Sequence, residues 1–131
     1  KMDLGNLTLP VYIYGSREDH IVPINAAYAS TQVLPGKKRF VMGASGHIAG
    51  VINPPAKGKR SHWIRADGKL PATLDQWLDG ATEHPGSWWT DWDGWIKGHA
   101  GKQIAAPKSY GKGTKFKAIE PAPGSYVKQK A

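Results

Sequence analysis

The chain has no cysteine among its 131 residues. This absence excludes a disulfide framework, a zinc site built from thiolates and a cysteine nucleophile supplied by this chain. Long apolar runs are also missing, and stretches such as residues 104–107 fall far short of the roughly 20 residues that span a bilayer, so no transmembrane segment is expected. Residues 1–5 have neither the apolar core nor the cleavage site of a signal peptide, which predicts a protein that works inside a cell.

Positive charge and apolar residues are both plentiful. Lysine and arginine number 18 against 10 acidic residues, which gives a net charge of +8, while 40% of the residues are hydrophobic. That apolar fraction is too high for a disordered polycation, and the length suits one small folded domain. A first residue of Lys instead of Met indicates a processed, tagged or excised piece of a longer protein.

The first half of the sequence predicts a strand–helix–strand unit. Residues 11–14 form a β-branched and aromatic run, expected as a strand buried on both faces. Apolar positions at i, i+3, i+4 and i+7 from Ile24 predict a helix that begins after Pro23 and ends before Gly36. Residues 38–43 form a second strand. A helical crossover makes the two strands parallel, so the polar loops that follow them share one edge of the sheet.

Two short helices are predicted in the second half. Prolines interrupt regular structure near residue 54, and the basic segment 57–65 is predicted to be a surface loop. Residues 73–76 fit a capping box that starts a helix with one apolar face, and a further helix is expected at residues 90–98. The apolar face of the first helix consists of Leu74, Trp77, Leu78 and Ala81. Packed helix faces are favoured over an exposed hydrophobic binding surface for the six tryptophans.

The last part of the chain has a different composition. Residues 101–131 contain seven lysines and one glutamate, without periodicity. We expect a basic extended strap here, belonging to the same domain as residues 1–100. Tyr110, Phe116 and Tyr126 among these lysines resemble a nucleic-acid strap, but other anionic partners are favoured, and no nucleic acid is expected.

One acid and one histidine follow the two predicted strands. Asp19 comes after the first strand and His47 after the second, so the topology can bring them together at the sheet edge. A histidine that acts as a general base needs a carboxylate on its Nδ1–H. In α/β-hydrolase enzymes the chain order is nucleophile, acid, histidine, and only the last two occur here. The alternative is structural: Asp19 as a loop residue or helix cap, and His47 as a loop histidine.

No other residue is predicted to be catalytic. Ser45 lacks the second glycine of a G-x-S-x-G elbow and follows the acid, so it is interpreted as a turn residue whose hydroxyl bonds the local backbone. His20 is interpreted as a solvated loop residue, with donation to Asp19 as the alternative. Three further histidines lack metal-ligand spacing and are interpreted as structural: His62, His84 and His99. Neither a metal nor a cofactor is predicted.

The motifs around these two residues resemble a known enzyme family. Residues 14–23, Tyr-Gly-Ser-Arg-Glu-Asp-His-Ile-Val-Pro, and residues 43–55, which begin Gly-Ala-Ser-Gly-His, are similar to the C-terminal part of the catalytic domain of class I polyhydroxyalkanoate synthases. The resemblance continues through Lys-Arg-Ser-His-Trp at residues 59–63, Gly-Ser-Trp-Trp at residues 86–89 and the tail. It implies the C-terminal portion of an α/β-hydrolase-type fold.

The resemblance also implies an activity. Such enzymes polymerise (R)-3-hydroxyacyl-CoA, for example 3-hydroxybutyryl-CoA, into polyester and release CoA through a Cys-His-Asp triad. Asp19 matches the aspartate and His47 the histidine, while the cysteine lies upstream in the family, so this chain alone is expected to be inactive. The alternatives are an α/β-hydrolase-type esterase or thioesterase and a non-catalytic basic binding module.

The partners that the resemblance implies are the acyl-CoA substrate, the growing polyester chain and the upstream cysteine-bearing segment. A homodimer of the full enzyme and contact with the polymer granule are implied as well. The expected location is therefore cytoplasmic and granule-associated.

Overall fold

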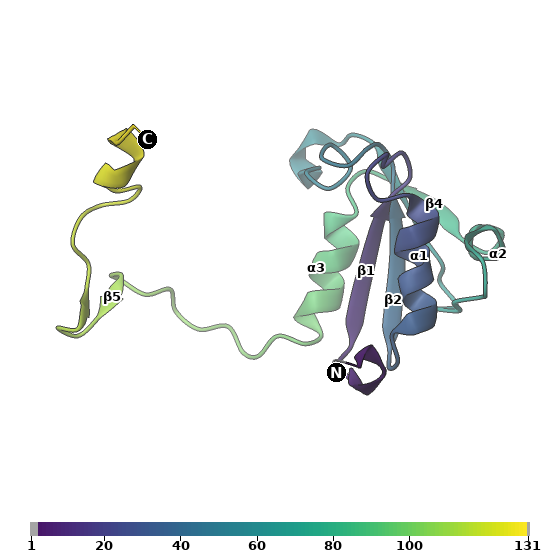
Figure 1. Cartoon of the computed structure of the whole chain (residues 1–131), viewed down its shortest axis with the longest axis horizontal. Helices are drawn as coiled ribbons and strands as arrows, with labels where there is room; N and C mark the ends of the chain where they lie inside the picture. The colour runs from purple at the N-terminus through teal and green to yellow at the C-terminus, as the bar shows by residue number, and fades with distance from the viewer. Residues whose placement is uncertain (1–2, 131) are drawn as a thin grey trace. The chain divides into compact units, whose positions relative to one another are not determined.

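The computed structural model describes residues 3–130, and the chain divides into two compact units, Lys1–Ala100 and Gly101–Ala131. The first unit contains a four-stranded sheet in the order β1-β2-β3-β4 (Figure 1). Its strands are β1 (Val11–Ser16), β2 (Lys38–Gly43), β3 (Ser61–Ile64) and β4 (Thr82–Pro85). The pair β1–β2 is parallel and the other two pairs are antiparallel, so the architecture is a mixed α/β sheet.

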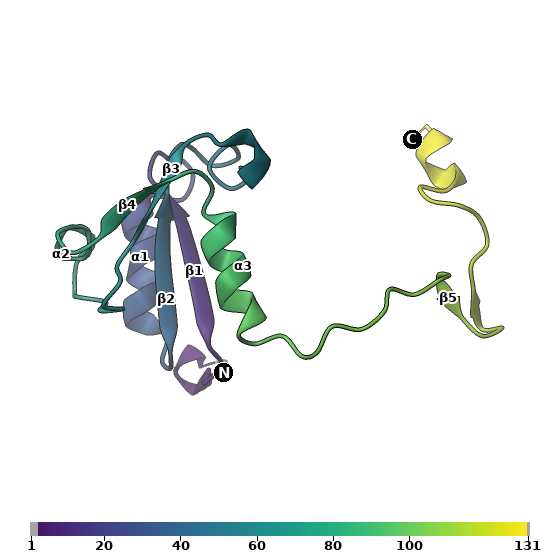
Figure 2. The same ribbon diagram turned by 180° about the vertical axis from the view of Figure 1, so that it is seen from behind.

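Helices cover both faces of this sheet. Helix α1 (Ile24–Val33) makes the crossover between the parallel strands and lies on one face together with the short helix α2 (Leu74–Leu78). Helix α3 (Trp89–Lys97) lies on the opposite face, as Figures 1 and 2 show from two sides. Two 3₁₀ turns complete the unit, η1 (Leu4–Asn6) and η2 (Pro55–Lys57).

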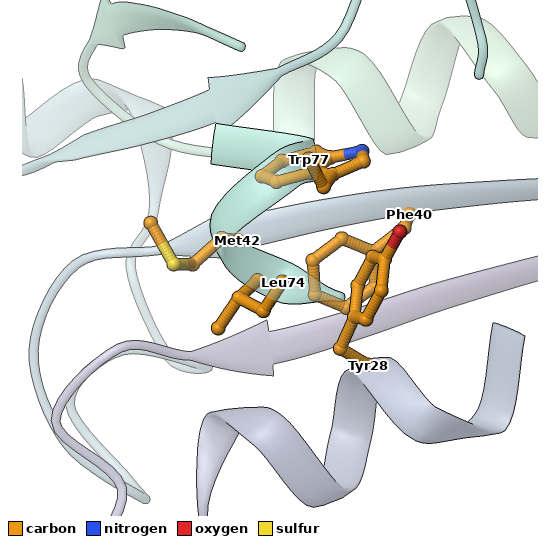
Figure 3. Packing of buried hydrophobic residues seen from close by; sticks show 5 residues of the cluster. All are labelled: Tyr28, Phe40, Met42, Leu74 and Trp77. Carbon is orange, nitrogen blue, oxygen red and sulfur yellow. The ribbon is translucent and has the colours of Figure 1, made fainter. Parts of the chain in front are cut away.

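The main core lies between the sheet and the α1–α2 layer (Figure 3). Phe40 and Met42 are two positions apart in β2, so their side chains point to the same face of the sheet. The Phe40 ring meets Tyr28 of α1 and Trp77 of α2 edge-on, with ring centroids 4.9 and 4.8 Å apart. Edge-to-face aromatic packing of this kind stabilises the fold beyond the contribution of the buried apolar area. The core confirms the predicted apolar faces of α1 and α2, including Leu74.

An ion pair and aromatic stacking hold α3 on the other face. Trp95 of α3 and Trp88, just before it, pack against the ring of Tyr12 in β1. The Tyr12 hydroxyl donates to Asp91 at 2.9 Å, and the Arg39 Nε–H donates to the same carboxylate at 2.8 Å. Burial opposes ionisation of Asp91, but the bonds from Arg39 and Tyr12 outweigh it and lower the pKa of this carboxyl.

Several predicted elements agree with the structure. The second strand spans residues 38–43 as predicted, and α1 begins directly after Pro23. The Thr73 side chain accepts a hydrogen bond from the Gln76 N–H at 3.3 Å, as in the predicted cap. Helix α3 differs from the predicted residues 90–98 by one position at each end. Trp77 is buried, but Trp92 is 40% exposed, so core packing describes only some of the tryptophans.

Three predictions about strands need correction. Residues 11–14 are half-buried instead of buried, because β1 is an edge strand among the described residues and α3 covers its face only in part. The basic segment 57–65 is not all loop, since β3 pairs with β2 and buries His62. Strand β4 was not predicted; all of its residues are exposed, and its pairing with β3 defines it.

The second unit has little regular structure. A small hairpin joins β5 (Gly111–Lys112) to β6 (Phe116–Lys117), and a 3₁₀ turn, η3, spans Ser125–Lys128. None of residues 101–130 is buried. The unit is largely extended, apart from the hairpin and the turn, which the sequence does not predict.

Candidate active site at the sheet edge

The loops after β1 and β2 lie together at the carboxyl edge of the parallel pair. The Arg17 N–H donates to the Gly43 carbonyl at 2.8 Å, and the Glu18 N–H donates to the Ser45 carbonyl at 3.0 Å. These backbone bonds extend the β1–β2 pairing beyond the strands. Side chains carried by the two loops are therefore held in a fixed relation to each other.

The structure brings Asp19 and His47 into direct contact. The His47 Nδ1 atom lies 2.8 Å from the Asp19 Oδ2 atom. The other oxygen of Asp19 accepts the N–H groups of Ile21 and Val22, each at 2.9 Å. The carboxyl group therefore caps the turn before α1 and also orients the imidazole ring. The Asp19 side chain is 8% exposed and that of His47 is 41% exposed.

These hydrogen bonds fix the charge state of the acid. The Val22 N–H is the largest influence and, with the bonds from His47 and Ile21, outweighs partial burial, so the pKa of Asp19 falls to about 2. An ionised carboxylate only accepts hydrogen bonds, so His47 Nδ1 is the donor, and in the neutral tautomer that this bond selects Nε2 carries the lone pair. No residue from 3 to 130 forms a hydrogen bond with Nε2, which leaves this nitrogen free to take a proton from a reacting group.

The turn that follows His47 is packed tightly against β1. The Gly50 N–H donates to the Gly46 carbonyl at 2.8 Å. A Cβ atom at Gly50 would lie 2.5 Å from Ser16 Oγ and 2.8 Å from the Gly46 carbonyl oxygen, so only glycine fits. Ser16 is itself buried. This close approach sets the path of the backbone on which His47 sits.

The remaining candidates lie outside the pair. Ser45 is a turn residue with φ of 76°, but no hydrogen bond of its hydroxyl is found in the described part of the chain, contrary to the predicted backbone bond. His20 is exposed and does not contact Asp19 through a hydrogen bond among residues 3–130. His62 is buried, with Nδ1 3.1 Å from the Gly86 carbonyl oxygen, which confirms its structural interpretation.

Neither a metal centre nor a membrane span is found in the described residues. Between residues 3 and 130, no three side chains of His, Asp or Glu gather in a way that would hold a metal ion. No helix in that range is long and apolar enough to cross a membrane.

Sequence analysis missed two tryptophans that reach this site. The indole N–H groups of Trp88 and Trp89 donate to the carbonyls of Gly50 and Val51, at 3.1 and 2.8 Å. The sequence predicted only that Trp88 shares a helix side with Trp92 and Trp95, and it gave Trp89 no role of its own. Together these observations define a class: a mixed α/β protein with a preformed Asp–His pair at the carboxyl edge of its parallel strands, a pairing also found in α/β-hydrolases.

Comparison with known proteins narrows this class. No family model matches the chain. The chain is 63% identical to the poly(3-hydroxyalkanoate) polymerase subunit of Cupriavidus necator over 130 residues, which is 99% of the chain and 22% of that protein. It is 42% identical to the corresponding subunit of Rhizobium etli, over 99% of the chain and 20% of the relative. Poly(3-hydroxyalkanoate) polymerase 2 of Ectopseudomonas oleovorans is 37% identical over 96% of the chain and 22% of its own length.

Nearly the whole chain thus matches a segment of curated poly(3-hydroxyalkanoate) polymerases, in agreement with the resemblance seen in its motifs. It spans about a fifth of the length of the curated relatives it matches.

Proposed function

We propose that this chain supplies the acid and the base of a Cys-His-Asp triad in an enzyme that polymerises (R)-3-hydroxyacyl-CoA. One observation carries the proposal: the 2.8 Å hydrogen bond between Asp19 and His47 lies within a sequence 63% identical to a poly(3-hydroxyalkanoate) polymerase. The β1–α1–β2 order and the acid-before-histidine order support an α/β-hydrolase-type fold for the complete domain.

The geometry supports a two-step acyl transfer. His47 Nε2 accepts the proton of a cysteine thiol supplied by another segment of the polymerase, and the thiolate attacks the thioester carbonyl of the substrate. The carbon–sulfur bond to CoA breaks, and CoA leaves with a proton returned by His47. The hydroxyl of the next monomer or chain end then gives its proton to the base and attacks the acyl-enzyme, so one ester bond forms and the cysteine is released.

Asp19 serves both steps by keeping His47 oriented. Its carboxylate stays ionised because its pKa is about 2, so it stabilises the imidazolium that forms when Nε2 takes a proton. The basic composition, +8 overall, favours partners with negative charge such as the phosphates of CoA. We include the polyester chain, a homodimer of the full enzyme and a cytoplasmic granule surface in the proposal, as the family resemblance implies.

A chimeric polymerase provides the test. In it, this chain replaces the matching segment of the Cupriavidus necator polymerase, and CoA release from (R)-3-hydroxybutyryl-CoA is measured. We expect His47→Gln to reduce turnover by at least 10²–10⁴-fold, the usual contribution of a general base. His84→Gln, at an exposed position of β4, is the matched control and should turn over like the parent chimera. Near-parental turnover of His47→Gln would refute the proposal.

The product separates polymerisation from the alternatives. Polymer supports a synthase, whereas free 3-hydroxybutyrate would indicate an esterase or thioesterase that passes the acyl group to water. The 131-residue chain alone, which has no cysteine, should release no CoA. CoA release by that chain would contradict the assigned nucleophile.

A further inference from the structure

The Gly-Ser-Trp-Trp segment (residues 86–89) connects β4 to α3 and has no part in the chemistry above. Its first half is anchored to the sheet. The Gly86 N–H donates to the Arg60 carbonyl at 2.7 Å, and the Gly86 carbonyl lies 3.1 Å from Nδ1 of the buried His62. Ser87 is also buried, and its Oγ accepts the Trp89 N–H at 3.0 Å. The base of the segment is therefore fixed.

Its second half reaches the turn that carries His47. Two consecutive indoles donate to two consecutive carbonyls: Trp88 Nε1 to Gly50 at 3.1 Å and Trp89 Nε1 to Val51 at 2.8 Å. The N–H is the only hydrogen-bonding group of an indole, so these two bonds fix the orientation of both rings. The pairs join elements that are 38 positions apart in the sequence.

The Trp88 ring is also held by a side chain of β1. It stacks on Tyr14 of β1 with centroids 4.2 Å apart, and the Tyr14 hydroxyl hydrogen-bonds Ser16 Oγ at 3.0 Å. Ser16 Oγ is the atom that leaves no room for a Cβ at Gly50. The turn after His47 is thus clamped between β1 on one side and the two indoles on the other.

His47 depends on this clamp because its ring has little other support. The imidazole is 41% exposed, and its one hydrogen bond within residues 3–130 goes to Asp19. The backbone after it forms a turn, not a helix or strand, so the ring position follows the position of residues 46–51. Small displacements matter, since a misplacement of about 1 Å can cost on the order of 10²-fold in rate.

We propose that Trp88 and Trp89 are positioning residues, which hold the turn after His47 through their indole N–H groups and so aim Nε2 at the reacting atoms. This inference rests on the proposed function. It assigns to residues 86–89 a role in turnover, distinct from core packing and from binding of the polymer by exposed aromatic rings.

The test uses the same chimeric polymerase with Trp88→Phe, Trp89→Phe and the double variant. Trp92→Phe is the matched control, because Trp92 lies in α3 and also packs against the Trp88 ring, but is itself 40% exposed and donates no indole hydrogen bond within the described residues. We expect kcat of the double variant to fall roughly 10–100-fold, up to the loss on the order of 10²-fold that a misplacement of about 1 Å can cause. KM should stay within about twofold, and Trp92→Phe should keep the parental kcat.

A second substitution keeps the result interpretable if the phenylalanine variants lose stability. β-(3-Benzothienyl)alanine at position 88 replaces the N–H by sulfur and keeps the two-ring shape, so stacking on Tyr14 is retained while the bond to Gly50 is lost. This variant should unfold at the parental temperature and still show a reduced kcat.

Each outcome decides between roles. A parental kcat in both the double variant and the benzothienyl variant, in a chimera that His47→Gln inactivates, would overturn the positioning role and leave the proposed function intact. A raised KM with unchanged kcat would overturn it too, in favour of substrate or polymer binding by the rings. If His47→Gln retains activity, the proposed function itself fails.

Discussion

Both units of the chain contain aromatic residues, but the two units use them differently. In the first unit, aromatic side chains recur with helix or strand periodicity and pack together, so that Tyr28, Phe40 and Trp77 are each at most 3% exposed. In the second, Tyr110, Phe116 and Tyr126 stand among lysines without a period and are 62–86% exposed. Apolar content alone does not produce a core. A periodic arrangement that lets several elements share one face is also required.

The largest effect is expected for Trp77 in the first unit. Trp77→Ala removes a ring that is 1% exposed and contacts Phe40 edge-on, so it leaves a cavity between α2 and the sheet. We expect a loss of about 3–5 kcal/mol in the free energy of unfolding, measured by urea denaturation followed by circular dichroism. Trp92→Ala, which removes a 40% exposed ring, should cost much less. Equal costs would show that the α1–α2 layer is not the main core.

The same comparison explains which elements the sequence reveals. Helix α1 and strand β2 were predicted closely because their apolar positions follow the helix and strand periods without interruption. Strand β3 was mistaken for loop because basic residues surround it, although His62 and Trp63 turn toward the sheet faces. Strand β4 has only exposed residues, and its pairing with β3 is a tertiary contact that no local sequence pattern predicts.

The candidate site also has one part that the sequence predicted and one part that it did not. Topology predicted that Asp19 and His47 could meet, because parallel strands bring their following loops to one edge, but the choice of a catalytic pair over a structural one depended on the motif resemblance. The contacts of Trp88 and Trp89 were not predictable, since each indole binds a backbone carbonyl, and backbone carbonyls occur at every position. The tight Gly50 contact with Ser16 likewise depends on distances that only the folded chain provides.

A smaller effect should distinguish Asp19 from other surface carboxylates of the first unit. Its pKa is about 2 in the folded chain and near 4 in an unfolded chain. Because the folded value is the lower one, the stabilisation from Asp19 is fully present above about pH 4 and is lost as the pH falls toward 2. The unfolding free energies of the parent and of Asp19→Asn should therefore converge over this window in acid-denaturation experiments.

Asp93→Asn is the control for this titration. Asp93 pairs with Lys97 on the exposed side of α3, with both side chains more than half exposed. The unfolding free energy of Asp93→Asn should stay within about 1 kcal/mol of the parent, because an exposed ion pair contributes little to stability. Divergence of the parent and Asp19→Asn toward low pH would mean that the carboxylate is not held by the Ile21 and Val22 N–H groups.

The smallest effect on the free energy of unfolding is expected in the second unit, where a phenylalanine can be compared with one in the first unit. The chain has two phenylalanines: Phe40 is 3% exposed, and Phe116 is 62% exposed in the two-residue strand β6. Phe40→Ala should cost about 3–5 kcal/mol in unfolding free energy. Phe116→Ala should change it by less than about 0.5 kcal/mol, because so short a hairpin has no core to lose. A cost above about 1 kcal/mol for Phe116→Ala would show that its ring is buried in solution, and the contrast between a packed and an unpacked unit would then fail.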